Sequence, residues 1–209
     1  MNAFHKKADR IYQINYKWKY GNETGILENI PAPAAIYARE YIPDIENIVR
    51  LRYSYGNRQA VTVDDKVFVE DRFGYTENAF FDIFDFPIVK GPSKEPFAQG
   101  LTVVLSESMA KKYFGNENPI GRIIHFRDTT LRVSAIMEDF PASSSLQFDM
   151  LFSMELQKLK FRGNAEWKTI DQNWGNADYA TYCVLKPGGD RGGHKQSGTK
   201  SAYRIKKNE

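Results

Sequence analysis

The sequence predicts an α+β fold, in which helices and strands follow one another in mixed order. Segments whose apolar residues alternate with polar ones, as in half-buried strands, are interspersed with short segments of helical periodicity. We count about seven such strands and four short helices, in an order that differs from the regular alternation of a doubly wound sheet. With 42% hydrophobic and 14% aromatic residues, the 209-residue chain can bury the core of one domain or of two small ones.

The N-terminal part is predicted to contain two helices and two strands. Residues 2–12 place apolar side chains at helical spacing, and residues 11–20 alternate aromatic or aliphatic residues with polar ones, so the two patterns overlap at their junction. Residues 31–43 are expected to form a short helix bounded by prolines. Residues 48–57 alternate again and end in a Gly-Asn turn.

The middle and C-terminal parts repeat the same two patterns. A strand is expected over residues 65–75 and a short aromatic helix over residues 77–86, before a loop rich in proline and glycine. The later strands are expected at residues 101–105, 122–126, 131–137, 146–154 and 179–186, the second and third forming a hairpin. No internal repeat at a fixed period is found.

The segment "VVLSESMAKKYFGNENPIG" at 103–121 has the appearance of a catalytic motif, because a serine follows a buried strand. Ser106 is instead well placed as the N-cap of a helix that runs to Phe114 and stops at Gly115. Ser106, Glu107 and Ser108 also lack the G-x-S-x-G context of a nucleophile elbow. We therefore interpret this segment as scaffold.

Other side chains that could carry chemistry are dispersed. The three histidines, His5, His125 and His194, do not pair at the spacing of metal ligands. Acidic residues that could in principle form a catalytic carboxylate pair are Asp64, Asp65, Asp71, Asp82, Asp85, Glu138 and Asp139. Such residues are common on solvated loops, so we predict no catalytic residue, no cofactor and no metal site.

The last 19 residues differ in composition from the rest. Residues 191–209 hold six lysines and arginines against one glutamate, a net charge of +5 that leaves −2 for residues 1–190. A nucleic-acid surface needs its basic residues on the folded part, so we expect no nucleic-acid partner. The run "GHKQSGTKS" nearly spells a phosphate-binding loop, but Thr199 displaces Lys200 from the lysine position of that motif. We expect residues 191–209 to be a disordered basic tail.

Two further features concern the cell compartment. Cys183 is the single cysteine, it lies in an alternating strand pattern, and we expect it to be packed as a small apolar residue. No apolar run approaches the roughly 18 residues that span a bilayer, and Met1 is not followed by a signal peptide, so the chain as written is expected to be soluble.

Several motifs in one order resemble the extracytoplasmic core domain of the MacB/FtsX-like permeases, the membrane subunits of one class of ABC transporters. They are "FHKKADRIYQI", "NAFFDIFDFPIVKG", "VVLSESMAKKYFGNENPIG" and "VSAIMEDFPASSSLQFDMLFS", with "PDIENIVRLR" as a weaker element. The resemblance covers about residues 2–188. It implies a porter-like βαβ lobe, residues 1–58 and 172–190, and an inserted sabre-like mixed α/β lobe, residues 59–171.

The resemblance also implies a function. It is that of a non-catalytic periplasmic domain at the inner membrane, which couples ATP hydrolysis by a separate cytoplasmic subunit to export or to mechanotransmission. The implied partners are transmembrane helices of the same permease, the ABC ATPase, a second permease copy and a periplasmic protein. Cargo and partner-binding residues are not specified.

The chain departs from the family pattern after "YCVLKPGGD", where a helix of the porter lobe is expected and a glycine-rich basic segment stands instead. We therefore expect an incomplete porter lobe. The alternative function is a free-standing periplasmic module that binds a hydrophobic ligand or peptide, because the aromatic content would suit a pocket.

Overall fold

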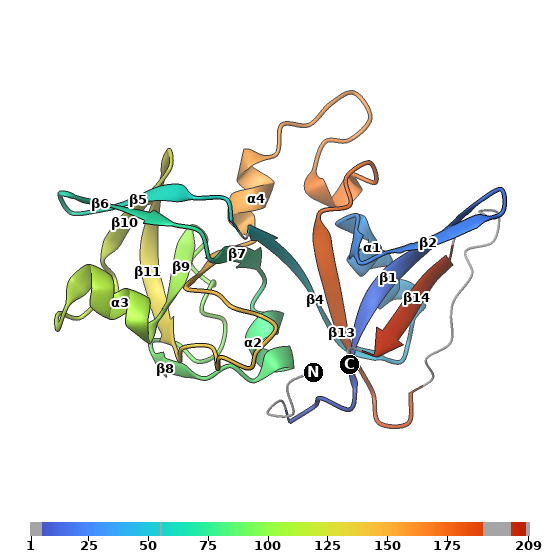
Figure 1. Ribbon diagram of the computed structural model, residues 1–209, viewed down its shortest axis with the longest axis horizontal. Helices are drawn as coiled ribbons and strands as arrows, with labels where there is room; N and C mark the ends of the chain where they lie inside the picture. Colours follow the sequence, from blue (N-terminus) through green and yellow to red (C-terminus); the bar gives the residue numbers. More distant parts are fainter. Residues whose placement is uncertain (1–5, 55, 190–201, 208–209) are drawn as a thin grey trace. The chain divides into compact units, whose positions relative to one another are not determined.

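The computed structural model describes residues 6–54, 56–189 and 202–207, the last for its backbone, and the chain forms two compact units (Figure 1). Unit 1 combines the N-terminal residues up to Arg52 with the residues from Phe161 onward. Unit 2, Tyr53–Lys160, is inserted between these two parts. The fold is α+β, as predicted. The sequence predicted unit boundaries near residues 58 and 172. In the structure the boundaries lie earlier in the chain, at 52/53 and 160/161.

Unit 1 is built on a four-stranded antiparallel sheet. Its strands are β1 (Ile11–Tyr20), β4 (Ile45–Ser54), β13 (Tyr179–Leu185) and β14 (Ala202–Lys207), in the order β14-β1-β13-β4. Helix α1 (Pro33–Tyr41) connects β1 to β4, which are parallel because both are antiparallel to β13. This order and these directions are those of the ferredoxin-like β-α-β-β-α-β arrangement. Two short strands extend the sheet: β2 (Glu23–Leu27) pairs with β1, and β3 (Asn29–Ile30) pairs with β13.

The start of the chain corrects one expectation. Residues 6–10 form turns, and β1 begins at Ile11. The helix predicted over residues 2–12 is therefore wrong for residues 6–12, the part that the structure describes. Ile11 and Tyr12 are drawn into the ladder by their partners Val184 and Cys183. Long-range strand pairing has therefore overridden the local helical periodicity.

The C-terminal segment also differs from expectation. Residues 202–207 form β14, which pairs with β1 from Tyr12↔Lys207 to Lys17↔Ala202, so the disorder expected of this part of the tail is wrong. The free edge of β1 supplies backbone donors and acceptors, and hydrogen bonding along it offsets the cost of ordering a polar segment. Residues 191–201, His194 and Lys200 among them, lie outside the described residues.

Helix α1 covers one face of this sheet. Its buried residues Ala34 and Ala35 pack against a cluster that includes Tyr12, Ile14 and Cys183. The two small side chains let the helix approach the strands closely. Cys183 is fully buried, as predicted, and burial raises the pKa of its thiol to about 12.

Arg50 of β4 connects the sheet to the segment that returns from unit 2. Its guanidinium is buried, forms an ion pair with Asp171 and donates a hydrogen bond to the Ala32 carbonyl at 3.4 Å. Asp171 lies in the 3-10 helix η1 (Ile170–Gln172), whose Ile170 is buried. Arg50 therefore joins β4, the start of α1 and η1 through one side chain.

Unit 2 contains a mixed sheet in the order β7-β12-β9-β11-β10-β5-β6. Its strands are β5 (Gln59–Val63), β6 (Lys66–Glu70), β7 (Phe73–Thr76), β8 (Ile88–Lys90), β9 (Thr102–Ser106), β10 (Ile123–Phe126), β11 (Thr129–Met137) and β12 (Met150–Ser153). The pairs β7–β12 and β9–β11 are parallel, and the other pairs in this order are antiparallel. The single strand predicted over residues 65–75 is in fact β6 and β7, separated by Asp71 and Arg72.

The core of unit 2 is rich in aromatic rings. Phe73, Phe126 and Phe152 of three strands pack with ring centroids 4.5 to 5.9 Å apart. Helix α2 (Ala79–Phe84) buries Phe80 and Phe84, among others, as its predicted aromatic pattern requires. A third short helix, α4 (Glu155–Lys160), follows β12 and buries Leu156.

Helix α3 (Glu107–Phe114) forms as predicted from its sequence. The Ser106 hydroxyl accepts a hydrogen bond from the Met109 amide at 3.2 Å, and the helix ends at Gly115, whose φ of 61° suits glycine. The face that carries Met109, Ala110, Tyr113 and Phe114 is buried. Asp139, after β11, accepts hydrogen bonds from both the amide and the hydroxyl of Ser108.

The buried face of α3 leads to a first prediction. Phe114→Ala is expected to destabilise unit 2 by about 3–5 kcal/mol, because a large buried side chain is lost. Glu107→Ala is the matched control and is expected to cost a few tenths of a kcal/mol, because Glu107 is exposed in the first turn. Ser106→Ala is expected to cost about 1 kcal/mol. Thermal melts measure all three, and equal melting temperatures for the two alanine variants at 107 and 114 would contradict the helix orientation.

The burial of Cys183 leads to a second prediction. A thiol reagent such as Ellman's reagent is expected to leave the native chain unmodified at pH 8 and to react with one thiol per chain in guanidinium chloride. The reason is that the thiolate is the reactive species, and a thiol with a pKa of about 12 holds almost none of it at pH 8. Rapid modification of the native chain would contradict the packing of β13.

Arg50 leads to a third prediction, for which the same strand offers a control. Arg50→Met is expected to destabilise unit 1 by about 2 kcal/mol; the cost is lower than for a fully buried pair because the Asp171 carboxylate remains partly hydrated. Arg52→Met removes an exposed ion pair with Asp178, 3.3 Å long, and is expected to cost under about 1 kcal/mol. Denaturant titrations of both variants check the order, and a larger loss for Arg52→Met would refute the role assigned to Arg50.

Candidate functional site

The serines of the 103–121 motif are occupied by structural contacts. The Ser106 hydroxyl caps α3, and Ser108 donates to Asp139. Burial tends to raise the pKa of Asp139, but the hydrogen bonds from Ser108 and Ser106 outweigh it and hold that pKa below its ordinary value. Asp139 is therefore an anionic partner of the helix start, and this arrangement fixes the N-terminal turn of α3 rather than activating a nucleophile.

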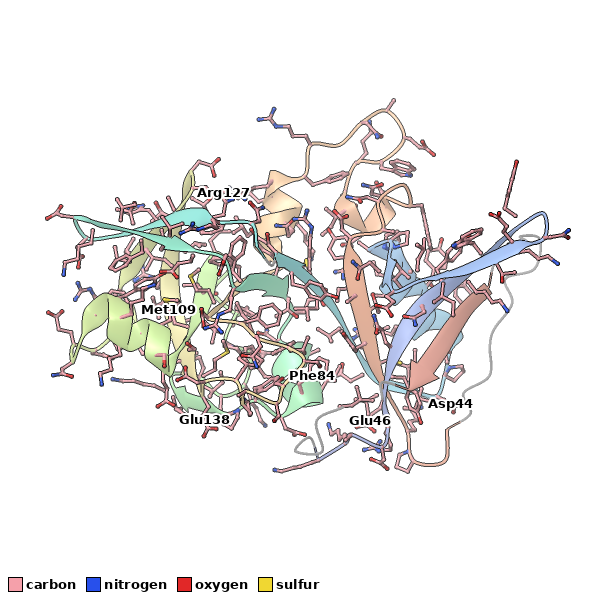
Figure 2. The ribbon with its side chains drawn as sticks, viewed as in Figure 1. Asp44, Glu46, Phe84, Met109, Arg127 and Glu138 are labelled. Carbon is pink, nitrogen blue, oxygen red and sulfur yellow. The ribbon has the colours of Figure 1, made fainter. Side chains whose placement is uncertain are left out.

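The other acidic residues considered above lie at separate places in unit 2. Asp64 and Asp65 form the β5–β6 turn, Asp71 follows β6, Asp82 and Asp85 belong to α2 and its C-terminal end, and Glu138 and Asp139 follow β11. Asp64 forms an ion pair with Arg122 at 2.9 Å, and Glu138 is exposed (Figure 2). Within residues 6–54, 56–189 and 202–207, no three histidine, cysteine, aspartate or glutamate side chains gather in a way that could hold a metal ion.

Of the histidines, the structure describes His125 alone. It lies on β10, and its Nδ1 is 3.1 Å from the Thr130 hydroxyl across the β10–β11 hairpin. His5 and His194 fall outside the described residues. The contact of His125 is a cross-strand contact on an exposed sheet surface.

A more informative feature is the end of unit 1 where the chain enters and leaves the sheet. Ile11, at the start of β1, is paired with Val184, near the end of β13. The Leu185 amide donates to the Arg10 carbonyl at 3.1 Å, and the Arg10 guanidinium donates to the Leu185 carbonyl at 2.6 Å. Residues 10 and 185 are thereby fixed side by side.

The start of β4 is tied to the same place. The Arg10 guanidinium also forms an ion pair with Glu46 at 2.6 Å, and the hydrogen bond from Arg10 lowers the pKa of that carboxyl. The Lys186 amide donates to the Asp44 carbonyl at 2.8 Å. We call these contacts of Arg10, Asp44, Glu46 and Leu185 the end clamp, since they hold three segments together at one end of the sheet.

An exposed aromatic cluster lies elsewhere on unit 1. Tyr37 and Tyr41 of α1 stack with ring centroids 5.7 Å apart, and Trp174, which follows η1, packs edge-on against Tyr37 at 5.2 Å. Tyr41 is 61% exposed, although it is aromatic. The position of η1 that brings Trp174 to α1 is secured by Ile170 and by the ion pair of Arg50 with Asp171.

Sequence reasoning missed both the end clamp and the aromatic cluster. The spacing of Tyr37 and Tyr41, one helical turn apart and off the alanine face of α1, was the available signal for the cluster. No local sequence pattern predicted that Trp174 would lie beside α1, because only the folding of the chain brings the two together. Exposed aromatic clusters of this kind are suited to contacts with other proteins, because they offer apolar area with polar tips.

The helices in the described part of the chain are short. None of them has the length and apolar character needed to cross a lipid bilayer.

Comparisons with known proteins assign the architecture. The chain has the same fold as a domain from Porphyromonas gingivalis that is described as part of a permease, with 21% identity, a TM-score of 0.77, and coverage of 98% of this chain and 93% of that one. It is also similar to the periplasmic region of MacB from Actinobacillus actinomycetemcomitans, with 17% identity, a TM-score of 0.59, and coverage of 85% and 75%. A third similar structure is the extracellular domain of the noncanonic ABC-type transporter YknZ from Gram-positive bacteria, with 13% identity, a TM-score of 0.56, and coverage of 84% and 83%. A comparison with curated protein sequences gave no match.

The sequence itself identifies the family. The model of the MacB-like periplasmic core domain matches residues 1–191, which include all of unit 2 and every described strand of unit 1 except β14. The motifs that carried the resemblance, from the first strand to the hairpin and β12, lie inside this range. The chain therefore belongs to the MacB-like periplasmic core domain family of ABC transporter permeases.

Proposed function

We propose that this domain is non-catalytic and transmits movement between a cytoplasmic ABC ATPase and the periplasm, for export or for mechanotransmission. The end clamp is the observation that carries the proposal beyond family membership. It lies at the start of β1, and β14 ends there with Lys207 opposite Tyr12, so that two membrane segments could continue from one end of unit 1. A displacement of the segment before Arg10 would reach β1, β4 and β13 together, because Arg10 contacts Glu46 and Leu185 at once.

The proposed partners follow from this role. They are transmembrane helices of the same permease, the cytoplasmic ABC ATPase subunit, a second permease copy and a protein of the periplasm. The location is the periplasmic side of the inner membrane. The aromatic cluster of Tyr37, Tyr41 and Trp174 supports the contact with a periplasmic protein, because it presents apolar area that the core does not use.

The absence of ATP turnover is a fourth prediction, which concerns the chain by itself. The purified chain is expected to hydrolyse ATP no faster than buffer, because its basic C-terminal segment departs from a phosphate-binding loop at Thr199. A phosphate-release assay measures this. Turnover by the chain that disappears in the Lys200→Ala variant would contradict a non-catalytic role.

Coupling is tested in the membrane protein that contains this domain. Arg10→Ala removes the side-chain contacts of the end clamp, whereas Lys7→Ala removes a marginal ion pair with Glu46, 3.9 Å long, and serves as the matched control. With the membrane protein reconstituted together with its ATPase, we expect Arg10→Ala to change the ATP hydrolysis rate at least ~2-fold and Lys7→Ala to leave it unchanged.

The outcomes separate the two functions considered. Melting temperatures of the two variants confirm that each domain is folded. Equal ATPase rates for both variants would remove the support that the end clamp gives to coupling. Failure of any ATPase to associate with the membrane protein, together with a melting temperature raised by hydrophobic peptides or ligands, would instead favour the free-standing binding module.

A further inference from the structure

Strand β6 leaves one edge of the unit 2 sheet unpaired among the described residues. It is the last strand in the order β10-β5-β6 and pairs there with β5 alone (Figure 1). Val63 and Lys66 flank the two-residue turn at Asp64 and Asp65 and form the pair that closes the hairpin. In such a hairpin the closing pair exchanges hydrogen bonds, and alternate residues do so along the ladder. Val67 and Val69 therefore direct their backbone N–H and C=O groups away from β5.

The two faces of β6 differ in character. Phe68 packs on Tyr113 of α3, with ring centroids 4.8 Å apart, and Glu70 is buried and accepts hydrogen bonds from Lys112 and Tyr113. On the other face, Val67 is 66% exposed and Val69 is 52% exposed. The strand is thus firmly anchored on one side and presents two β-branched apolar residues to the solvent on the other.

The middle of this edge, Val67 to Val69, lacks the features that normally prevent strand pairing. Protected edges carry proline, a bulge or charged side chains along their length. The ladder between β5 and β6 runs from Gln59↔Glu70 to Val63↔Lys66 without a register shift, and its only charged residues stand at the two ends of β6. The three residues between them are apolar, so β6 can accept another strand.

The order of residues in β6 favours one occupant, which is β6 itself. The sequence Lys-Val-Phe-Val-Glu is symmetric about Phe68 in size and opposite in charge at its ends. An antiparallel pairing of two copies about Phe68 places Lys66 opposite Glu70 and Val67 opposite Val69. A parallel pairing in register would instead place Lys66 opposite Lys66 and Glu70 opposite Glu70, which is unfavourable.

We propose that the β6 edge is a homodimer interface, in which two copies of this chain pair antiparallel about Phe68. The outward groups of Val67 in one copy bond to those of Val69 in the other, giving about four main-chain hydrogen bonds across the two-fold axis. The exposed valines cover one another on one face of the joined sheets. The interface is small, so the association is weak, with a dissociation constant on the order of 100 µM.

This inference goes beyond the proposed function, which includes a second permease copy but assigns no surface to it. The β6 interface depends on the strand alone and not on coupling to an ATPase. Its failure would therefore leave the proposed function unaffected, and a loss of coupling would leave the interface unaffected.

Sedimentation equilibrium of the purified chain between about 10 µM and 1 mM tests the interface, a range chosen to bracket weak association. The chain is expected to show a monomer–dimer equilibrium. Val67→Lys is expected to weaken dimerisation at least ~10-fold, because it places like charges diagonally across the two-fold axis. Val89→Lys on β8, where the valine is 45% exposed, is the matched control and is expected to dimerise like the parent. A chain that remains monomeric at 1 mM, or equal dimerisation by the two variants, would overturn the proposal.

Residue-specific amide exchange of the parent chain gives a second test. It needs no substitution, so the result cannot be caused by a variant that fails to fold. With increasing concentration of the parent chain, the Val67 and Val69 amides are expected to gain protection from exchange. The Phe68 amide, which faces β5, is expected to be protected at every concentration. Protection of Val67 and Val69 that does not change with concentration, in a chain that dimerises, would place the interface on another surface and refute the pairing.

Discussion

The antiparallel pairing of β1 with β13 is the contact on which the rest of unit 1 depends. It joins segments about 175 residues apart in sequence, as the separation of Arg10 and Leu185 shows. The central position of both strands in the order β14-β1-β13-β4 means that α1, β4 and β14 are all placed by this pair. The end clamp at Arg10 closes the same ladder. The contacts that hold unit 1 together therefore include those through which we propose that movement enters it.

Much of this architecture was readable from local sequence. Alternation identified β1, β4 and β13, the prolines marked α1, and Ser106 and Gly115 gave the limits of α3 within one residue. These predictions succeeded because caps, turns and periodicity act over a few residues. The helix predicted over the first residues failed where β13 recruited Ile11 and Tyr12, and β14 was missed because its order comes from the β1 edge, far away in sequence.

The candidate site was less predictable for the same reason. The N-cap role of Ser106 was predictable from local sequence and is confirmed. The positions of Trp174 beside Tyr37 and of Arg10 between Glu46 and Leu185 were not predictable in this way. Each of these contacts joins segments that only the folded sheet brings together. The partners of the buried charges were unpredictable for the same reason. Arg50 and Glu70 form ion pairs with residues of distant elements, which identifies both as parts of the scaffold.

The insertion of unit 2 has a consequence for the order in which the chain is made. During synthesis, the last residue of unit 2, Lys160, emerges before β13, which begins at Tyr179. Unit 2 can therefore fold before the chain is complete, while β1 and β4 still lack the strand that lies between them. Closing the β1–β13 ladder is then easier, because a folded insert replaces a long flexible loop whose closure entropy would oppose the pairing. The nascent chain thus passes through a stage in which β1 and β4 have no common partner, and binding by a chaperone at that stage would protect them from pairing with other chains.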